Sequence, residues 1–254
     1  MDRFSLAGKR AVVTGGTRGL GRAIAEGLME AGAQTVIVGT SDQVFVQAKS
    51  FCAQGFSCQG VRADLASDTQ RRAAFSEAVS SLGGLDILVN AAGILTRSSV
   101  EELSYEDWEA VLQLDLNAVF VLSQLAVQEF LRKEKPCGKI INIASMHSFG
   151  GGLYVSSYAA AKGGVAQLSK AMSNELMGRG INVNCIAPGF MATDMNREHM
   201  KPGNARGAEI LSRIPAHRWG SMEDIKGLAI FLASPASDYI SGAVIPCDGG
   251  YLVY

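Results

Sequence analysis

The stretch TGGTRGLG, Thr14–Gly21, decides the fold of this chain of 254 residues. It follows the short apolar run RAVVT, Arg10–Thr14, and leads into Gly19–Ala31, where apolar residues recur with helical spacing. Its key glycines are Gly15, Gly19 and Gly21. Glycine permits a tight turn and a close approach to the backbone, and the first N–H groups of a helix attract anions. A glycine loop between a strand and a helix therefore favours the binding of a dinucleotide through its phosphates.

Apolar runs and helical segments continue to alternate along the chain. The further runs that we interpret as strands are Thr35–Val38, Cys58–Val61, Asp86–Asn90, Lys139–Ser145, Ile181–Ala187 and Ala243–Cys247. Further helices are expected at Thr69–Leu82, Tyr105–Lys133, Tyr158–Met177 and Met222–Ala233. Val and Ile fill both alternating positions in the stronger runs, as in strands buried on both faces. The pattern predicts one α/β domain, residues 1–254, with about seven parallel strands doubly wound between helices. The strand-free stretch 190–218 predicts a partly helical flap over a site.

Composition and charge argue against several classes of protein. The net charge is −1, without a long basic or acidic run, so neither nucleic acid nor an anionic membrane is the expected partner. No run of 18 apolar residues and no signal-like N-terminus occurs, so we expect a cytoplasmic protein without a transmembrane helix. The five scattered cysteines lack a CxxC pair and the three histidines lack ligand spacing, so we expect neither a disulfide framework nor a metal site.

The end of the second predicted strand bears on the choice between NAD(H) and NADP(H). A carboxylate there normally binds the ribose 2′-hydroxyl of NAD. In this chain Gly39, Thr40 and Ser41 come first, and Asp42 arrives late. Arg18, inside the glycine loop, can instead pair with a 2′-phosphate, although a solvated turn residue is the alternative interpretation. The sequence weakly favours NADP(H) as the cofactor, and NAD(H) remains the alternative.

Seven motifs, in order, resemble those of the short-chain dehydrogenase/reductase family over essentially the whole chain. They are TGGTRGLG (Thr14–Gly21), ADL (Ala63–Leu65), NAAG (Asn90–Gly93), IAS (Ile143–Ser145), YAAAK (Tyr158–Lys162), APGFMAT (Ala187–Thr193) and DGG (Asp248–Gly250). The resemblance implies a Rossmann-type fold and an NAD(P)-dependent alcohol dehydrogenase or ketoreductase. The small residues around the YAAAK motif resemble the family's subunit interface, which implies a homotetramer. The cofactor contacts implied are Gly15, Thr17, Arg18, Gly19, Leu20, Gly21, Thr40, Asp64, Leu65, Asn90, Ala91, Gly93, Tyr158, Lys162, Pro188, Gly189, Met191 and Thr193.

The residue types in the YAAAK motif suit hydride transfer between a nicotinamide and an alcohol or ketone. Reduction of a ketone needs a proton, and a tyrosine hydroxyl can supply it if a nearby cation favours tyrosinate. Lys162 lies four residues after Tyr158, on the same face of a helix. Ser145 would orient the substrate oxygen. The Tyr158–Lys162 spacing alone is common, so the assignment depends on Ser145 and the glycine loop.

One position departs from the family pattern. The family usually has an asparagine five residues before a phenylalanine in the long helix that precedes the fifth strand. Phe120 places that position at Asp115, whereas Asn117 lies two residues further on and faces another way. An aspartate can also accept a hydrogen bond from water, so Asp115 is predicted to take part in a proton relay to Lys162.

The C-terminal half resembles dehydrogenases that act on hexonate-type sugar acids, such as 2-deoxy-D-gluconate or gluconate. A carboxylate needs a cation, and Arg97 is the first candidate, followed by His147, with Ser145 and Tyr158 on the reacting oxygen. A 3-oxoacyl-carrier-protein reductase is the alternative, and it would need a basic patch beside the site. A dinucleotide-binding regulatory protein without turnover is a remote second alternative.

Overall fold

The computed structural model describes residues 3–253, apart from the side chain of Met195. Its sheet is parallel throughout, in the order β3-β2-β1-β4-β5-β6-β7. The strands are β1 Arg10–Thr14, β2 Gln34–Gly39, β3 Cys58–Arg62, β4 Ile87–Asn90, β5 Gly138–Ile143, β6 Ile181–Pro188 and β7 Val244–Cys247. The chain builds outward from β1 to β3, then returns to β4 and builds outward to β7. The carboxyl ends of β1 and β4 therefore flank the switch point at which such sheets bind ligands.

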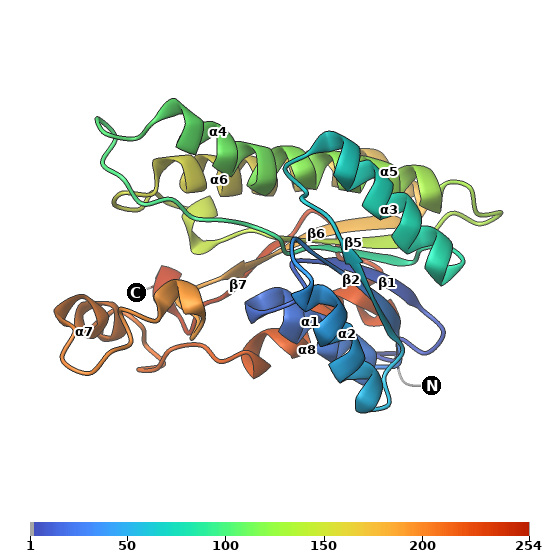
Figure 1. The fold of residues 1–254 in the computed structure, drawn as a ribbon, viewed down its shortest axis with the longest axis horizontal. Coiled ribbons are helices and arrows are strands. Elements are labelled where there is room, and N and C mark those ends of the chain that lie inside the picture. The colour runs from blue at the N-terminus through green and yellow to red at the C-terminus, as the bar shows by residue number, and fades with distance from the viewer. Residues whose placement is uncertain (1–2, 254) are drawn as a thin grey trace.

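Helices cover both faces of the sheet (Figure 1). On one face are α1 Gly19–Glu30, α2 Gln43–Ala53 and α8 Glu223–Ala233. On the other face are α3 Asp68–Leu82, α4 Tyr105–Leu112, α5 Ala118–Phe130 and α6 Ser156–Leu176. Alternate residues of β1 face opposite sides of the sheet. Val13 packs into the core on the side of α1 and α8, and Val12 packs into the core on the side of α3 and α5. The predicted doubly wound α/β fold is confirmed.

The long helix expected at Tyr105–Lys133 is interrupted, which corrects the prediction. α4 ends at Leu112, and Gln113–Asn117 forms a wider π-helical turn before α5 begins. The N–H of Ala118 donates to the carbonyl of Gln113, five residues earlier, instead of four. Helix α2 was not among the predicted helices, and the partly helical 190–218 segment contains α7, Ala205–Ser212.

The combined run Tyr105–Phe130 is, by length and composition, the one helix among residues 3–253 able to cross a membrane. It is part of the layered domain, however. α4 packs against α6, α5 packs against α3, and the π turn places the buried carboxylate of Asp115 against α6. Core helices of globular domains can have the same length and composition, so this run is no evidence for a membrane protein.

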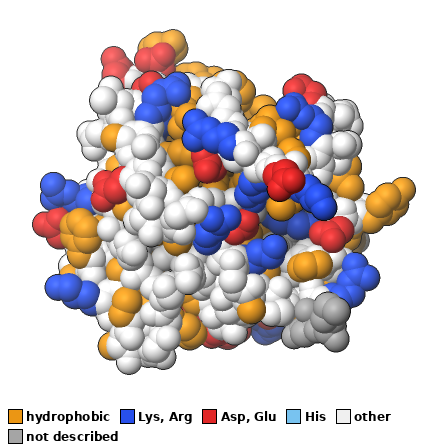
Figure 2. Space-filling model, turned by 90° about the vertical axis from the view of Figure 1, so that its right-hand side faces the viewer, with side chains coloured by type: hydrophobic (Ala, Val, Ile, Leu, Met, Phe, Trp, Pro, Cys, Tyr) orange, Lys and Arg blue, Asp and Glu red, His pale blue; other side chains and the backbone are white. Residues whose placement is uncertain are grey.

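Asp86 joins the amino ends of β1 and β4 through ionic hydrogen bonds. Its carboxylate contacts Arg10 Nε and Lys133 Nζ, each at 2.8 Å. Burial raises the pKa of Asp86, but hydrogen bonds from Arg10 and Lys133 outweigh it and lower the pKa to about 2. On the face shown in Figure 2, positive and negative side chains are interspersed.

Asp86→Asn is expected to lower the free energy of unfolding by about 2 kcal/mol at pH 7. Because the pKa of Asp86 is lower in the folded state, its contribution is present above about pH 4 and is lost as the pH falls towards 2. Urea denaturation at pH 7 and pH 2.5 measures the difference. Asp42→Asn, which removes an exposed partner of Arg62, is the control and should cost less than about 1 kcal/mol. An equal loss for Asp86→Asn at both pH values would contradict this assignment.

Candidate active site

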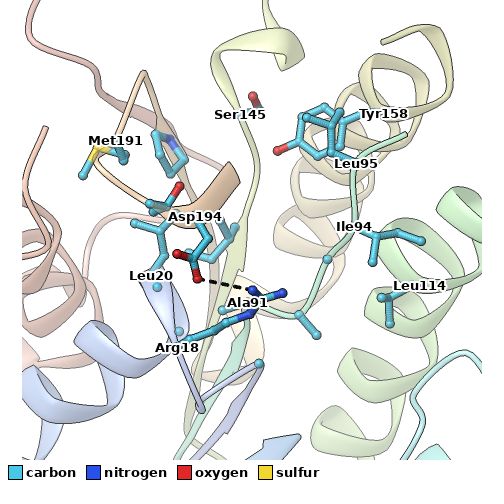
Figure 3. Close-up of a pocket in the computed structure, with 18 of the residues that line it drawn as sticks. Arg18, Leu20, Ala91, Ile94, Leu95, Leu114, Ser145, Tyr158, Met191 and Asp194 are labelled. Atoms are coloured by element: carbon cyan, nitrogen blue, oxygen red, sulfur yellow. Dashed lines mark hydrogen bonds and ion pairs between the residues drawn. The ribbon is translucent and has the colours of Figure 1, made fainter. Parts of the chain in front are cut away.

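A cavity of about 630 Å³ opens at the carboxyl ends of the strands, at the switch point (Figure 3). The glycine loop, the loop after β4, the end of β5 and the segment after β6 form its walls. The predicted site residues that line it are Gly15, Thr17, Arg18, Gly19, Leu20, Gly21, Thr40, Leu65, Ala91, Gly93, Arg97, Ser145, His147, Tyr158, Pro188, Gly189, Met191 and Thr193. The fold therefore brings most of the predicted residues to one cavity.

The glycine loop is shaped for close approach to a ligand. Gly15 has a φ of 67°, and a Cβ on it would lie 2.9 Å from the backbone of Ala92. Thr14 Oγ1 accepts hydrogen bonds from the N–H groups of Ala91 and Ala92, which ties this loop to the one after β4. The N-cap of α1, Arg18, makes no side-chain cap hydrogen bond. The first N–H groups of α1 are thus left for a phosphate, and the residues present fit a dinucleotide.

Among the described residues that line the cavity beside the end of β2, none is a carboxylate. Thr40 lines the cavity, but Asp42 does not, and its Oδ1 is 2.9 Å from Arg62 Nη1 on the strand next to it. Arg18 lies across the cavity from the segment after β6, and its Nη1 is 3.3 Å from Asp194 Oδ2 (Figure 3). Both partners are exposed, so this pair is weak and Arg18 is available to an anionic ligand.

Ser145 and Tyr158 are fixed relative to one another by a short helix, η2, Met146–Ser148. Ser145 is its extended N-cap, and Ser145 Oγ accepts from the N–H of His147 at 3.1 Å. Ser148 Oγ accepts from the N–H of Ser145 and donates to the carbonyl of Lys162 at 2.7 Å, which ties η2 to α6. Figure 3 shows the hydroxyls of Ser145 and Tyr158 directed into the same part of the cavity. Ser148 was not among the predicted site residues.

Lys162 lies behind Tyr158 and is almost entirely buried. Its Nζ donates to the carbonyl of Ile143 at 2.9 Å, pairs with Asp115 Oδ2 at 3.1 Å and lies 5.5 Å from the centre of the Tyr158 ring. Burial opposes its charge, but the attraction of Asp115 and then of Tyr158 outweighs burial, so the pKa of Lys162 is raised. The lysine is therefore a permanent cation beside the tyrosine at any pH near neutrality.

Asp115 reaches this cluster from the π turn. Its side chain is fully buried, and Oδ1 accepts from the N–H of Ile94 at 2.8 Å. Oδ2 contacts Lys162 as an ion pair and not as a well-directed hydrogen bond. A Cβ on Gly93 would lie 2.7 Å from Oδ2, so the glycine makes room for the carboxylate. Asn117 is exposed, as its position two residues later predicted.

Two basic side chains line the part of the cavity that lies beside Tyr158. Arg97, from the loop after β4, and His147, from η2, both line it. The His147 ring meets the Tyr158 ring edge-on, with 6.2 Å between centroids. Burial, with a smaller contribution from the charge of Arg97, lowers the pKa of His147. Near neutral pH the histidine is therefore an uncharged hydrogen-bonding group beside a cationic arginine.

Some predicted residues lie outside the cavity lining. Lys162 and Asp115 lie behind it, as described above. Asp64 Oδ1 accepts from the N–H of Ala66 at 2.9 Å and shapes the turn after β3. Asn90 is buried, and its Nδ2 donates to Ser123 Oγ and to Asn142 Oδ1. In this structure, the hydrogen bonds of the Asp64 and Asn90 side chains therefore fix the backbone that follows β3 and β4, which forms part of the cavity wall.

Several lining residues were not among the predicted site residues. They include Leu95, Leu114, Phe190 and Asp194. Phe190 also packs edge-on against Trp219 and Tyr251, which ties the segment after β6 to the C-terminal residues. Leu95 and Leu114 give no signal of this kind in the sequence, whereas Phe190, inside the APGFMAT motif, and Asp194, next to it, could have been noted.

Comparison with known proteins places the chain in a family. The family model described as "Enoyl-(Acyl carrier protein) reductase" matches residues 15–252. The 2-dehydro-3-deoxy-D-gluconate 5-dehydrogenase of Escherichia coli is 44% identical over 258 residues, covering 99% of this chain and 98% of that protein. The gluconate 5-dehydrogenase of Gluconobacter oxydans is 36% identical over 257 residues, covering 99% and 98%.

A solved structure agrees with these relatives. The gluconate 5-dehydrogenase of Burkholderia cenocepacia, in complex with NADP and tartrate, is 38% identical and superposes with a TM-score of 0.94. The match covers 100% of this chain and 98% of that one. Fold, motif order and full-length similarity agree. The chain belongs to the short-chain dehydrogenase/reductase family of NAD(P)-dependent oxidoreductases.

Proposed function

We propose that this enzyme interconverts a secondary alcohol and a ketone on a sugar acid, with Tyr158 as the proton donor and acceptor. The observation that carries the proposal is the convergence of Ser145 and Tyr158 on one part of the cavity, with the buried cation of Lys162 behind the tyrosine ring. The full-length similarity to sugar-acid dehydrogenases supports the substrate class.

Each catalytic side chain has a separate task. When bound, a nicotinamide cofactor supplies or accepts the hydride. Ser145 donates a hydrogen bond to the substrate oxygen and orients it, and Tyr158 gives that oxygen a proton during reduction or takes one during oxidation. Lys162 stabilises the tyrosinate that remains. The link from Ser145 through Ser148 to the backbone of Lys162 keeps the two hydroxyls in register.

The cofactor would be held by the glycine loop and by the walls formed after β3, β4 and β6. The predicted cofactor contacts that line the cavity would bind the cofactor directly. The side chains of Asp64 and Asn90 would contribute indirectly, because their hydrogen bonds fix the loops that form the walls. NADP(H) is favoured over NAD(H), because Arg18 is available and Asp42 is engaged by Arg62. The Burkholderia relative, which binds NADP, is consistent with this preference.

The substrate carboxylate would be bound by Arg97, with His147 as a neutral partner. Both line the cavity on the side of Tyr158, and no other cationic side chain of the described residues lines that end. Tartrate, found in the Burkholderia relative, is itself a hydroxy acid with carboxylates. A sugar acid such as gluconate or 2-deoxy-D-gluconate satisfies the same groups.

Arg97→Ala is expected to lower kcat/KM for a keto-hexonate by about 10- to 100-fold, the value of one charge-assisted hydrogen bond. For an uncharged ketone of similar size the change should be less than about threefold. Steady-state assays with NADPH measure both. Arg132→Ala, which removes an exposed arginine that does not line the cavity, is the control. An equal loss on charged and uncharged substrates would contradict carboxylate recognition by Arg97.

The whole proposal is tested by one assay panel. The purified enzyme is given NADPH or NADH with keto-hexonates, acetoacetyl thioesters and simple ketones. Turnover of keto-hexonates with a preference for NADPH is the expected result. Turnover restricted to thioesters would replace the proposal with the acyl-carrier-protein reductase alternative.

The segment 190–218 is proposed to act as a flap over the substrate. Met191 and Asp194 line the cavity, and Asn196 Nδ2 donates to the Met191 carbonyl, which gives the segment a defined start.

A homotetramer in the cytoplasm is proposed for assembly and location. The exposed aromatic side chains of Tyr105 on α4 and Phe120 on α5 support an interface on that layer.

A further inference from the structure

Asp115 puts a full negative charge where the family pattern has a neutral amide. The carboxylate is 3.1 Å from Lys162 Nζ, and the two side chains are 0% and 5% exposed. A second bond, from the N–H of Ile94, fixes the carboxylate from the other side. The contact with the lysine is direct, and the proton relay through water that the sequence suggested for Asp115 stays a prediction.

Few other charged or titratable groups face this pair and Tyr158. His147 on η2 packs edge-on against the tyrosine, and Arg97 lies beyond it. Cys185 on β6 is buried near Lys162 and donates to Ser169 Oγ, and burial raises the pKa of this thiol to about 11. At neutral pH the thiol and the imidazole are uncharged, so Asp115 is the near counter-charge to Lys162.

We propose that Asp115 is a positioning residue that neutralises Lys162 and so sets the pH range in which Tyr158 exchanges its proton. The proposal rests on the proposed function, because it assigns Tyr158 the proton that the reaction moves.

The physical reason is the difference between a charge and an ion pair. A lone ammonium beside Tyr158 would favour tyrosinate through its full Coulomb potential. A carboxylate 3.1 Å from the ammonium turns it into a dipole, whose potential falls off faster with distance. Tyrosinate is then favoured less, and the enzyme should work in a more alkaline range than it would with asparagine at position 115.

Asp115→Asn restores the amide of the family pattern and is the test variant. Ultraviolet absorbance titration of the cofactor-free protein follows tyrosinate formation. Subtracting the titration of a Tyr158→Phe protein in the same background isolates Tyr158 from the other five tyrosines. The Tyr158 transition should move to lower pH by about one unit in Asp115→Asn. The pH profile of kcat should move in the same direction.

Two further variants make the result specific. Asp107→Asn removes the same charge from the exposed first turn of α4 and should leave the transition unmoved. Gly93→Ala keeps the carboxylate but adds a Cβ that would lie 2.7 Å from Oδ2, so it should produce a smaller shift to lower pH. If Asp115→Asn does not fold, the shift of the Tyr158 transition in Gly93→Ala tests the proposal instead.

The outcomes separate this inference from the proposed function. An unmoved or alkaline-shifted Tyr158 transition in both Asp115→Asn and Gly93→Ala overturns the role of Asp115, even if the wild type turns over keto-hexonates. If the Tyr158 transition moves as expected in these variants but the wild type turns over no keto-hexonate, the ion-pair role is supported and the proposed function is overturned.

Discussion

Tyr158→Phe should lower kcat on the order of 10³-fold, within the range attributed to a positioned general acid or base. The substitution removes only the hydroxyl, and the ring can keep its edge-on contact with His147 and its place near Lys162. The affinity for NADPH should stay within about threefold of the wild type. Steady-state kinetics gives the first quantity, and a fluorescence titration of bound NADPH gives the second.

Tyr239→Phe is the matched control, because Tyr239 is 97% exposed and does not line the cavity. It should leave both quantities unchanged. If Tyr158→Phe kept more than about a tenth of wild-type turnover, another group would have to supply the proton. A parallel loss of NADPH affinity would instead mean that the substitution had disturbed the cofactor site.

Gly21→Ala should weaken NADPH binding by about 100-fold or more. A Cβ on Gly21 would lie 2.4 Å from the carbonyl oxygen of Gly15, a backbone atom that cannot rotate away. Gly15 in turn is pressed against Ala92, so the loop cannot move without displacing the loop after β4. The N–H groups that would bind the phosphates would lose their alignment, and each lost charge-assisted bond costs about 1.5–3 kcal/mol.

Gly227→Ala is the control for this substitution, because Gly227 is also in a helix but has no atom within 4 Å of its added Cβ. It should leave NADPH affinity unchanged. Calorimetric titration compares the two variants with the wild type. Wild-type affinity in a folded Gly21→Ala protein would contradict the proposed phosphate-binding role of the loop.

The sequence predicted the sheet well because its strands are buried on both faces. Runs such as Ile181–Ala187 are apolar at five of seven positions, and the corresponding β6 is buried throughout. Helix α2 was missed because its apolar residues include Val and Phe, which are also frequent in strands. The spacing of Val44, Ala48 and Phe51, which are its buried residues, could have revealed it.

The site was predictable in its motifs but not in its long-range contacts. The Tyr158–Lys162 pair follows from helical spacing, and the order of the motifs placed Ser145. The ion pair of Lys162 with Asp115 joins residues 47 positions apart (162 − 115), and the contact of Asp115 with Ile94 joins a helix to a loop. Neither follows from periodicity. The π turn is equally hidden, since its residues QLDLN fit an ordinary helix.

The π turn gives the long helix a change of phase. An α-helix advances about 100° per residue, so one extra residue in a turn rotates everything after it relative to everything before it. In an uninterrupted helix, the residues before and after this point would keep one common phase. With the offset, α4 stays on α6 while α5 turns its apolar side to α3, β4 and β5. The extra residue lets one continuous chain segment serve two partners, with a carboxylate pointing inward at the point of rotation.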